Sequence, residues 1–438
     1  MALPSLDDYF PDWKDREALA EAMIPLTGKL YRKNVVVYCS GPALYNQSVT
    51  RLMKAHRYVR QLAQNELSEF ETYPILVAMS EMDLGPCHVD VGKMASTLIE
   101  RSIKDEAEIK HYVNEQCAKV IGVATPPLAA PQDIVLFGFG RIGRLLARLL
   151  IEKTGGGTQL RLRAIVVRRS GANDIAKRAG LLRRDSVHGS FQGTLRVDEE
   201  NECIIANGNV IRVIYAEGPD KVDYTSYGID NAIIIDNTGA WSDEEGLSQH
   251  LKSKGASRVI LTAPGKGSIK NIVAGINHRD IEPEDALLAA ASCTTNAIVP
   301  VLKAVNDRFG IVNGHMETVH AYTNDQNLID NFHKKNRRGR GAPLNMVITE
   351  TGASSAVTKL LPELDGKLTG NAIRVPTPNV SLVILNLTLD QTTDEEEVKE
   401  FLRTSALHGK LQRQICLLYT SDAADDSLRV DLGGRRII

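Results

Sequence analysis

A cysteine in surroundings that make a thiol reactive stands in the segment Ser292-Cys293-Thr294-Thr295-Asn296. It follows the alanine-rich apolar run 286–291 and precedes apolar residues at helical spacing. We therefore predict that a strand ends, the chain turns, and Cys293 lies at a helix N-terminus. Unpaired backbone N–H groups and the helix dipole stabilise a thiolate there. The competing interpretation is a buried cysteine in a turn of small residues, because buried free cysteine is common.

His320 is the candidate base that a cysteine nucleophile needs to remove its proton. Arg338 and Arg374 follow further along the chain, and arginine is suited to bidentate binding of phosphate. Either arginine alone would be interpreted as an ordinary exposed side chain. It is the combination of a cysteine, a histidine and two arginines that favours a catalytic interpretation.

A glycine motif follows a short apolar strand predicted over 133–137 and precedes a helix predicted over 144–153. The motif is Gly138-Phe139-Gly140-Arg141-Ile142-Gly143. Its glycines permit a tight turn and let a pyrophosphate approach the helix N-terminus. A GxGxxG pattern alone is a weak signal, but between a strand and a helix it predicts dinucleotide binding. All six residues of the motif are candidate cofactor-binding residues.

Taken together, these segments resemble phosphorylating glyceraldehyde-3-phosphate dehydrogenase, from about Asp133 to about Gln412. The first 130 or so residues resemble the extension of long bacterial forms of that enzyme. The resemblance implies that Cys293 and His320 are catalytic. It implies that Thr323 and Arg374 hold the substrate phosphate, and that Ser292, Thr294, Arg338, Thr351 and Gly352 hold inorganic phosphate. Thr238, Gly239 and Thr262 are the candidates beside the nicotinamide.

The choice between NAD and NADP stays open at the end of the strand predicted over 162–167. An acidic residue there would hydrogen-bond the adenosine ribose and repel a 2′-phosphate, but Arg168-Arg169-Ser170 stands instead. Arg168 is therefore a candidate ligand for the 2′-phosphate of NADP. In the alternative, the arginines face solvent, and Asp174 or the backbone serves the ribose.

The predicted fold class is an α/β Rossmann domain plus an α+β catalytic domain, preceded by a helical N-terminal extension. The expected domains are the extension at 1–130, the NAD(P)-binding Rossmann domain at 131–292, and the catalytic domain at 293–412. Residues 413–438 have neither helical nor strand periodicity and look like a non-native tail. In members of the family that the chain resembles, further sheet and a final helix would follow at this point. We therefore expect the catalytic domain to be incomplete and the activity of this chain to be compromised.

Composition excludes several classes of function. The 438 residues are 43% hydrophobic with a net charge of −2, so no global field recruits nucleic acid or an anionic membrane. We expect no signal peptide, no membrane span and no metal site, and a cytoplasmic location, since the six cysteines lack disulfide-like or CxxC spacing. The resemblance implies a homotetramer when full length, although a missing C-terminal helix would hinder assembly.

The function implied by the resemblance is oxidation of glyceraldehyde 3-phosphate to 1,3-bisphosphoglycerate with inorganic phosphate. The reaction passes through a cysteine thioester with hydride transfer to NAD or NADP, in glycolysis or gluconeogenesis. One alternative is erythrose-4-phosphate dehydrogenase, which shares much of the pattern. Another is a non-catalytic regulatory or binding protein in which the helical extension is the working part. Loss of Cys293 or His320 would favour that reading, and both are present.

Overall fold

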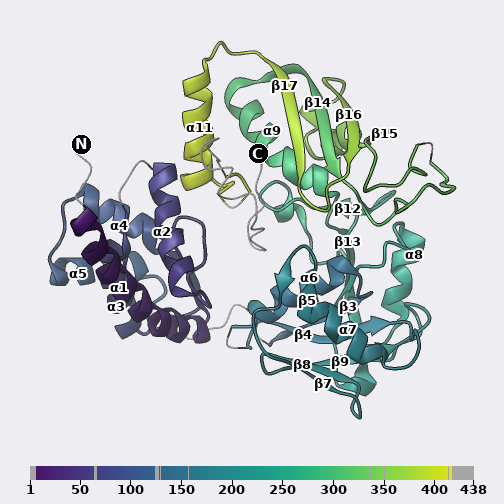
Figure 1. The fold of residues 1–438 in the computed structure, drawn as a ribbon, viewed down its shortest axis with the longest axis horizontal. Coiled ribbons are helices and arrows are strands. Elements are labelled where there is room, and N and C mark those ends of the chain that lie inside the picture. The colour runs from purple at the N-terminus through teal and green to yellow at the C-terminus, as the bar shows by residue number, and fades with distance from the viewer. Residues whose placement is uncertain are drawn as a thin grey trace. The chain divides into compact units, whose positions relative to one another are not determined.

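The computed structural model describes residues 6–63, 67–123, 128, 130–155, 157–335, 337–349, 351–412 and 414–416. The chain divides into an N-terminal unit, Met1–Gln132 with Glu152–Arg161, and a C-terminal unit, Asp133–Ile151 with Leu162–Ile438. Figure 1 shows the ribbon. Nearly all of the tail predicted at 413–438 lies outside the described residues, as does most of the linker at 125–131.

The N-terminal unit is mostly helical, as predicted, but it also contains a short parallel sheet that was not predicted. Strands β1 and β2 pair in register from Val35 with Cys87 to Tyr38 with Asp90. Helices α2 and α3 lie between these strands in the chain, as a parallel connection requires. The elements are α1 (Leu6–Arg32), β1 (Val35–Tyr38), α2 (Val49–Ala63), α3 (Glu69–Glu81), β2 (Cys87–Asp90), α4 (Val91–Glu100) and α5 (Glu106–Cys117).

Among the described residues of the N-terminal unit, one carboxylate is fully buried, and it is paired. Glu69 begins α3 and accepts a hydrogen bond from Arg16 Nε at 2.7 Å. The His56 ring lies beside the same carboxylate, and burial lowers the pKa of that ring. Ser68 and Glu71 form a capping box that fixes the start of α3. These contacts explain how the unit tolerates a carboxylate in its core.

The first half of the C-terminal unit is built on a nine-stranded sheet of order β12-β13-β11-β10-β3-β4-β9-β8-β7. Strand β3 lies inside this sheet, and its residues 133–137 are all buried, as expected for a central strand. The strands are β3 (Gln132–Phe137), β4 (Leu160–Val167), β7 (Leu195–Asp198), β8 (Cys203–Ala206), β9 (Asn209–Tyr215), β10 (Ala232–Asp236), β11 (Ala256–Leu261), β12 (Lys270–Asn271) and β13 (Leu287–Ala289). The helices are α6 (Arg141–Glu152), α7 (Asp174–Arg183) and α8 (Glu244–Ser248), and β5 (Arg184–Asp185) pairs with β6 (Gly189–Ser190).

The second half is a four-stranded mixed sheet of order β15-β16-β14-β17, which fits the α+β prediction. Its strands are β14 (Ile311–Ala321), β15 (Val347–Thr349), β16 (Leu368–Val375) and β17 (Ser381–Leu389), and its helices are α9 (Cys293–Phe309), α10 (Ala353–Leu360) and α11 (Glu395–His408). Leu302 of α9 packs with Met316 of β14 in one apolar core. Val383 packs on the same core whereas Leu382 is exposed, so neighbouring residues of β17 point to opposite faces of the sheet.

No helix among the described residues is both long and apolar enough to cross a membrane.

Candidate active site

Cys293 is the first residue of α9, where the sequence predicted it. Ala291 has a φ of +56°, an unusual value for a residue with a side chain, and it turns the chain out of β13. Ser292 caps the helix by accepting the backbone N–H of Thr295 at 3.0 Å. The Asn296 side chain donates to Ala290 O at 2.7 Å and to Ser292 O at 2.9 Å. The turn therefore fixes the thiol at the positive end of the α9 dipole.

The thiol of Cys293 faces the imidazole predicted to be its base. Cys293 Sγ lies 3.3 Å from His320 Nε2, and Cys293 is exposed. The hydrogen bond with His320 lowers the pKa of Cys293 to about 7, and hydrogen bonds with Thr294 contribute, whereas the partial desolvation of the sulfur by surrounding protein atoms opposes the shift. A large fraction of Cys293 is therefore thiolate at neutral pH, as a cysteine nucleophile requires.

His320 and Arg374 are brought together by strand register. They are direct partners on the parallel strands β14 and β16. Arg374 Nη1 lies 2.9 Å from His320 Nδ1 and donates to Ala321 O at 3.1 Å and to Thr323 Oγ1 at 3.3 Å. Burial and the charge of Arg338 lower the pKa of the Arg374 guanidinium. A guanidinium thus lies beside the imidazole that faces the thiol.

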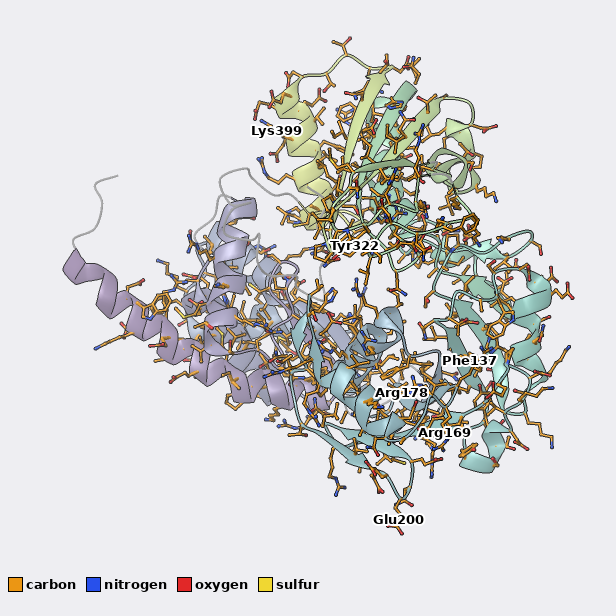
Figure 2. The ribbon with its side chains drawn as sticks, turned by 45° about the vertical axis from the view of Figure 1, so that its right-hand side comes forward. Phe137, Arg169, Arg178, Glu200, Tyr322 and Lys399 are labelled. Carbon is orange, nitrogen blue, oxygen red and sulfur yellow. The ribbon has the colours of Figure 1, made fainter. Side chains whose placement is uncertain are left out.

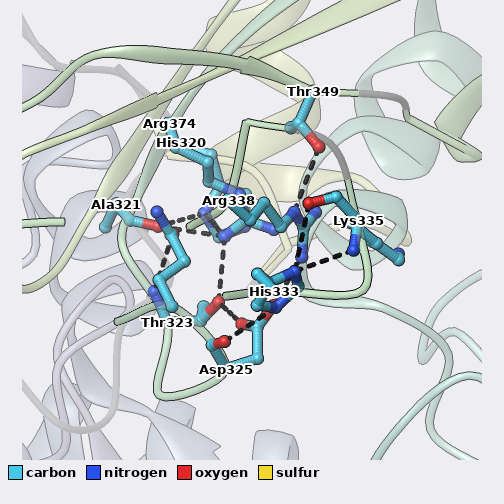
Figure 3. Close-up of polar contacts among 10 residues, drawn as sticks. His320, Ala321, Thr323, Asp325, His333, Lys335, Arg338, Thr349 and Arg374 are labelled. Carbon is cyan, nitrogen blue, oxygen red and sulfur yellow. Dashed lines mark hydrogen bonds and ion pairs between the residues drawn. The ribbon is translucent and has the colours of Figure 1, made fainter. Parts of the chain in front are cut away.

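Thr323 and Arg338 meet at a carboxylate, Asp325, for which the sequence predicted no role. Asp325 accepts hydrogen bonds from the Thr323 hydroxyl and from Arg338 Nη1, the latter at 2.5 Å (Figure 3). Arg338 Nε also donates to the Thr349 hydroxyl at 3.1 Å. No motif signalled this contact, because Arg338 reaches Asp325 only through the folding of the loop between β14 and β15.

The remaining candidates for inorganic phosphate lie at two helix starts. Ser292 and Thr294 flank Cys293 at the start of α9, and the Ser292 hydroxyl is engaged there as the helix cap. Thr351 precedes Gly352, which occupies the N-cap position of α10. Helix N-termini present backbone N–H groups and a positive dipole end, which suit an anion.

The glycine motif forms a cradle in which each glycine has its own reason to lack a side chain. Gly138 has a φ of +90°, and a Cβ there would meet Thr238 Cγ2 at 2.8 Å. A Cβ on Gly143 would meet the carbonyl oxygen of Gly138 at 2.5 Å. A Cβ on Gly140 would meet nothing within 4 Å. The first and third glycines thus serve the fold, and the second leaves open space where a pyrophosphate would approach α6.

The other residues of the motif differ in what they present. Helix α6 begins at Arg141, three residues earlier than predicted, and the side chains of Arg141 and Ile142 are exposed. The Phe139 side chain is buried in the apolar core with Ala147, so only its backbone is available to a cofactor. The cradle fits a dinucleotide through backbone groups rather than through Phe139.

Two substitutions in this cradle have separable expected effects. Gly143→Ala is expected to destabilise the fold by about 1–3 kcal/mol, because its Cβ collides with backbone, and to weaken cofactor binding. Gly140→Ala is expected to leave stability unchanged while lowering cofactor affinity roughly tenfold, because its methyl group fills the open space. Thermal unfolding and fluorescence titration with NAD and NADP measure the two effects. Equal affinities for wild type and Gly140→Ala would contradict this placement of the pyrophosphate.

At the adenosine side, Arg168 faces solvent, as one alternative from the sequence expected, but Asp174 is not available to a ribose. Asp174 does not face a ribose, because it is buried and accepts hydrogen bonds from Ser170, Arg178 and Tyr215. Arg168 follows β4 with an exposed side chain that donates to the backbone oxygen of Glu217 at 3.3 Å. Arg178, labelled with Arg169 in Figure 2, donates a hydrogen bond to the backbone oxygen of Arg168 at 2.8 Å. In this turn Arg168 lies 3.9 Å from the Glu217 carboxylate and Arg169 pairs with Glu202, whereas Asp174 is already engaged by its own partners.

The candidates on the nicotinamide side lie around one buried carboxylate. Asp236 accepts the backbone N–H and the hydroxyl of Thr238, each at 2.7 Å, and its other oxygen lies 3.0 Å from His250 Nε2. Gly239 follows with a φ of +68°. The Thr262 hydroxyl donates to the backbone oxygen of Asp236 at 3.0 Å. All three predicted residues are therefore grouped at the ends of β10 and β11.

Two family models match the chain. The glyceraldehyde 3-phosphate dehydrogenase NAD binding domain matches residues 132–244, and the C-terminal domain of the same enzyme matches residues 292–428. The first match contains the glycine cradle. The second begins at the helix cap of Cys293 and contains His320, Arg338 and Arg374.

Curated relatives agree with the family models. A glyceraldehyde-3-phosphate dehydrogenase-like protein of Pseudomonas aeruginosa is 62% identical, over 90% of this chain and 86% of its own length. That match must include most of the N-terminal unit. A chloroplastic glyceraldehyde-3-phosphate dehydrogenase A of Zea mays is 39% identical, over 65% of this chain and 70% of its own. Glyceraldehyde-3-phosphate dehydrogenase of Zymomonas mobilis is 38% identical, over 64% of this chain and 80% of its own length. The chain therefore belongs to the glyceraldehyde-3-phosphate dehydrogenase family.

Proposed function

We propose that this protein oxidises glyceraldehyde 3-phosphate to 1,3-bisphosphoglycerate, using inorganic phosphate and NAD or NADP. The observation that carries the proposal is the 3.3 Å contact between Cys293 Sγ and His320 Nε2, with Arg374 against the same imidazole. A non-catalytic protein would not need this arrangement, in which a thiol of lowered pKa is exposed beside a base.

The first chemical step makes a covalent adduct on Cys293. The thiolate attacks the aldehyde carbon and forms an S–C bond, and the carbonyl oxygen becomes an alkoxide that takes a proton from His320 Nε2. The result is a hemithioacetal and a neutral imidazole. Because Nε2 already faces the sulfur, the imidazole lies within reach of an oxygen on the attacked carbon.

The second step is the oxidation, followed by phosphorolysis. A bound nicotinamide supplies the hydride acceptor. His320 Nε2 accepts the hydroxyl proton of the hemithioacetal as the hydride leaves the same carbon, which becomes a thioester. An oxygen of inorganic phosphate then attacks the thioester carbon, the C–S bond breaks, and the thiolate of Cys293 is released with an acyl phosphate as product.

Two anions must be held during this cycle, and we propose the division that the resemblance implies. Thr323 and Arg374 would hold the phosphate of the sugar. Ser292, Thr294, Arg338, Thr351 and Gly352 would hold inorganic phosphate. The hydrogen bond from Arg374 Nη1 to the Thr323 hydroxyl supports the first group. The positions of Ser292, Thr294, Thr351 and Gly352 at helix starts support the second.

The decisive assay follows reduction of NAD or NADP with and without inorganic phosphate. Oxidation of glyceraldehyde 3-phosphate is expected to depend on added phosphate and to exceed oxidation of erythrose 4-phosphate. Oxidation that proceeds equally well without phosphate would contradict a phosphorylating enzyme. Faster oxidation of erythrose 4-phosphate would instead favour the alternative function, that of an erythrose-4-phosphate dehydrogenase.

The turn after β4 predicts how the cofactors are discriminated. We expect the chain to accept NADP, because Arg168 is exposed there and Asp174 is engaged elsewhere. Arg168→Asp is expected to lower NADP affinity roughly tenfold or more and to shift the preference toward NAD. Arg196→Asp on β7 makes the same charge change on an exposed strand residue and serves as the control. A ratio of NAD to NADP affinity that Arg168→Asp leaves unchanged would exclude Arg168 from the site.

Self-association is the proposed assembly, and an apolar surface on the loop between β14 and β15 supports it. Four apolar side chains of this loop are each at least 75% exposed: Leu328, Phe332, Leu344 and Met346. A group of exposed apolar side chains is typical of a protein interface. We propose that copies of this chain cover these residues in a homo-oligomer. Sedimentation of the wild type is expected to give a species larger than a monomer, and Leu328→Ser with Phe332→Ser is expected to dissociate it. A monomeric wild type at high protein concentration would exclude this assembly.

A cytoplasmic location is part of the proposal. None of the six cysteines forms a disulfide, which fits a reducing compartment. Cell fractionation with activity measured in each fraction tests it.

A further inference from the structure

One loop in the second half of the C-terminal unit carries hydrogen bonds to the first half. It is the segment 376–380, between β16 and β17. Arg141 Nη1, at the start of α6, donates a hydrogen bond to the backbone oxygen of Pro378 at 3.5 Å. The Asn379 amide donates to His188 Nε2 at 3.4 Å. Two bonds between residues at least 191 positions apart in the chain therefore end on neighbouring residues of this loop.

The His188 ring is held by a carboxylate so that it presents an acceptor to Asn379. His188 Nδ1 lies 3.1 Å from Asp185 Oδ1. An ionised carboxylate only accepts, so Nδ1 carries the hydrogen, and Nε2 keeps a lone pair for the Asn379 amide. The same oxygen accepts the backbone N–H groups of Val187 and His188, each at 3.0 Å. Although burial opposes ionisation of Asp185, these hydrogen bonds lower its pKa.

This ring is connected to the helix that closes the glycine cradle. Arg144, in the first turn of α6, donates to Asp185 Oδ2 at 3.5 Å. The side chains of Asp185 and His188 are each 8% exposed, so the connection belongs to the interior of the first half. The first turn of α6 thus carries Arg141 and Arg144, which both lead to the loop 376–380. It is also the turn that a pyrophosphate would approach.

On its other side the loop 376–380 adjoins the imidazole of the active site. Arg374 lies just before the loop, and Ser381, which follows it, is the antiparallel partner of His320. The Ser381 hydroxyl accepts the backbone N–H of Ala321 at 3.3 Å. A displacement of the loop would therefore be transmitted to the strand ends that carry His320 and Arg374.

The loop is held in a conformation that its own residues disfavour. Val380 has a φ of +66°, in a region that a β-branched residue rarely occupies. Its side chain is 52% exposed, so its own packing does not enforce this conformation. Strain of this kind persists only where neighbouring contacts over-determine it. The bonds of Asn379 and Ser381, on either side of Val380, are such contacts. For that reason the loss of even a long hydrogen bond can displace the loop.

We propose that His188 and Asn379 are positioning residues that dock the loop 376–380 on the first half and so set the distance between the nicotinamide and the carbon bound to Cys293. The cofactor cradle lies in the first half and the thiol in the second, and hydride transfer needs the two reacting carbons at a short, fixed separation. Neither positioning residue needs to touch the substrate. The inference rests on the proposed function, because hydride transfer is a step of that reaction.

Two variants, here called the docking variants, break this bond from opposite ends. Asn379→Ala removes the donor. His188→Asn keeps an amide N–H for Asp185 in the place of Nδ1, but it has no acceptor in the place of Nε2. Asn386→Ala is the matched control, because it makes the same change at an exposed asparagine of β17. Thermal unfolding checks that each variant is folded.

Rapid mixing measures the first turnover of cofactor reduction with glyceraldehyde 3-phosphate. Inorganic phosphate is omitted, because it is needed only after hydride transfer. We expect this phase to be about tenfold slower in both docking variants and within about twofold of the wild type in Asn386→Ala. Deuterium on the aldehyde carbon should slow the phase in every protein, which identifies it as hydride transfer. Cofactor dissociation constants should stay within about twofold, because the glycine cradle is unchanged.

A second measurement needs no turnover. Cys293 should be shielded from N-ethylmaleimide by any nicotinamide that is close enough to accept the hydride. Saturation with the tighter-binding of NAD and NADP should therefore slow alkylation of Cys293 in the wild type and in Asn386→Ala. This protection should be weaker in the docking variants, whereas alkylation without cofactor should be equally fast in all proteins. Mass spectrometry of the peptide that contains Cys293 gives the rates.

Several outcomes would overturn the docking role. They are an unchanged first turnover in the docking variants, an equal loss in Asn386→Ala, or a slowed phase that has lost its isotope effect. Full protection of Cys293 in the docking variants, or no protection in the wild type, would overturn it as well. A wild type that oxidises no aldehyde, or whose steady-state oxidation needs no inorganic phosphate, would instead refute the proposed function, and the protection of Cys293 by cofactor would still decide the docking role.

Discussion

Cys293→Ser is expected to lower turnover by at least about a thousandfold while leaving cofactor affinity nearly unchanged. The reason is that the Cys293 thiol has a pKa lowered to about 7, whereas a serine hydroxyl in the same place does not ionise near neutral pH. Initial rates of NAD or NADP reduction measure the loss. Fluorescence titration with the same cofactor measures the cofactor affinity, which is expected to be retained.

The control for Cys293→Ser is a second thiol of the same unit. Cys203→Ser changes a buried cysteine of β8, whose pKa is raised by burial, so it is expected to leave the chemical step intact. Near-normal turnover in Cys293→Ser, or an equal loss in Cys203→Ser, would refute Cys293 as the nucleophile.

His320→Gln is expected to have the second largest effect, and it can be measured without turnover. The hydrogen bond with His320 is the largest cause of the lowered pKa of Cys293, so its loss should return that pKa to about 9 or above. At pH 7 the thiolate fraction then falls from about one half to about one in a hundred. Alkylation of Cys293 by iodoacetamide should slow about fiftyfold at that pH.

The difference in alkylation rate between wild type and His320→Gln is expected to depend on pH. A thiol of lowered pKa gains its thiolate at a lower pH, so alkylation of the wild type should exceed that of His320→Gln by the largest factor below about pH 7, and the two rates should converge above about pH 10. Turnover should fall further than alkylation, because the variant also lacks the group that accepts the hemithioacetal proton. Alkylation profiles that coincide at every pH would show that His320 does not activate the thiol.

The architecture could be predicted where short patterns determine it. The strand at 133–137 and the glycine motif predicted the Rossmann turn, because few other folds place glycines at that spacing between a strand and a helix. The pairing of β1 with β2 was not predicted, since two four-residue strands separated by about fifty residues carry no local signal of their register. The family models and relatives then supported the domain types that the motifs suggested.

The part of the site that could be predicted is the part in which the residue types alone indicate the chemistry. A cysteine at a predicted helix start and a downstream histidine indicate a nucleophile and its base, and the structure places them in contact. The alternative role for Asp174 failed because one of its partners, Tyr215, comes from a distant strand. Asp325 was missed for the same reason, since its contact with Arg338 depends on the path of a loop.

Pairing His320 with Arg374 across β14 and β16 makes the proton acceptor and the proposed anchor of the sugar phosphate one rigid piece. An insertion or deletion of one residue in either strand would turn one of these side chains to the opposite face of the sheet. Cys293 lies on a separate helix, α9, which shares one apolar core with that sheet, including Leu302 of the helix and Met316 of β14. Substitutions in the apolar contacts of α9 can therefore change the position of the Cys293 sulfur relative to the substrate. The distance between His320 and Arg374 would stay the same, because strand pairing fixes it.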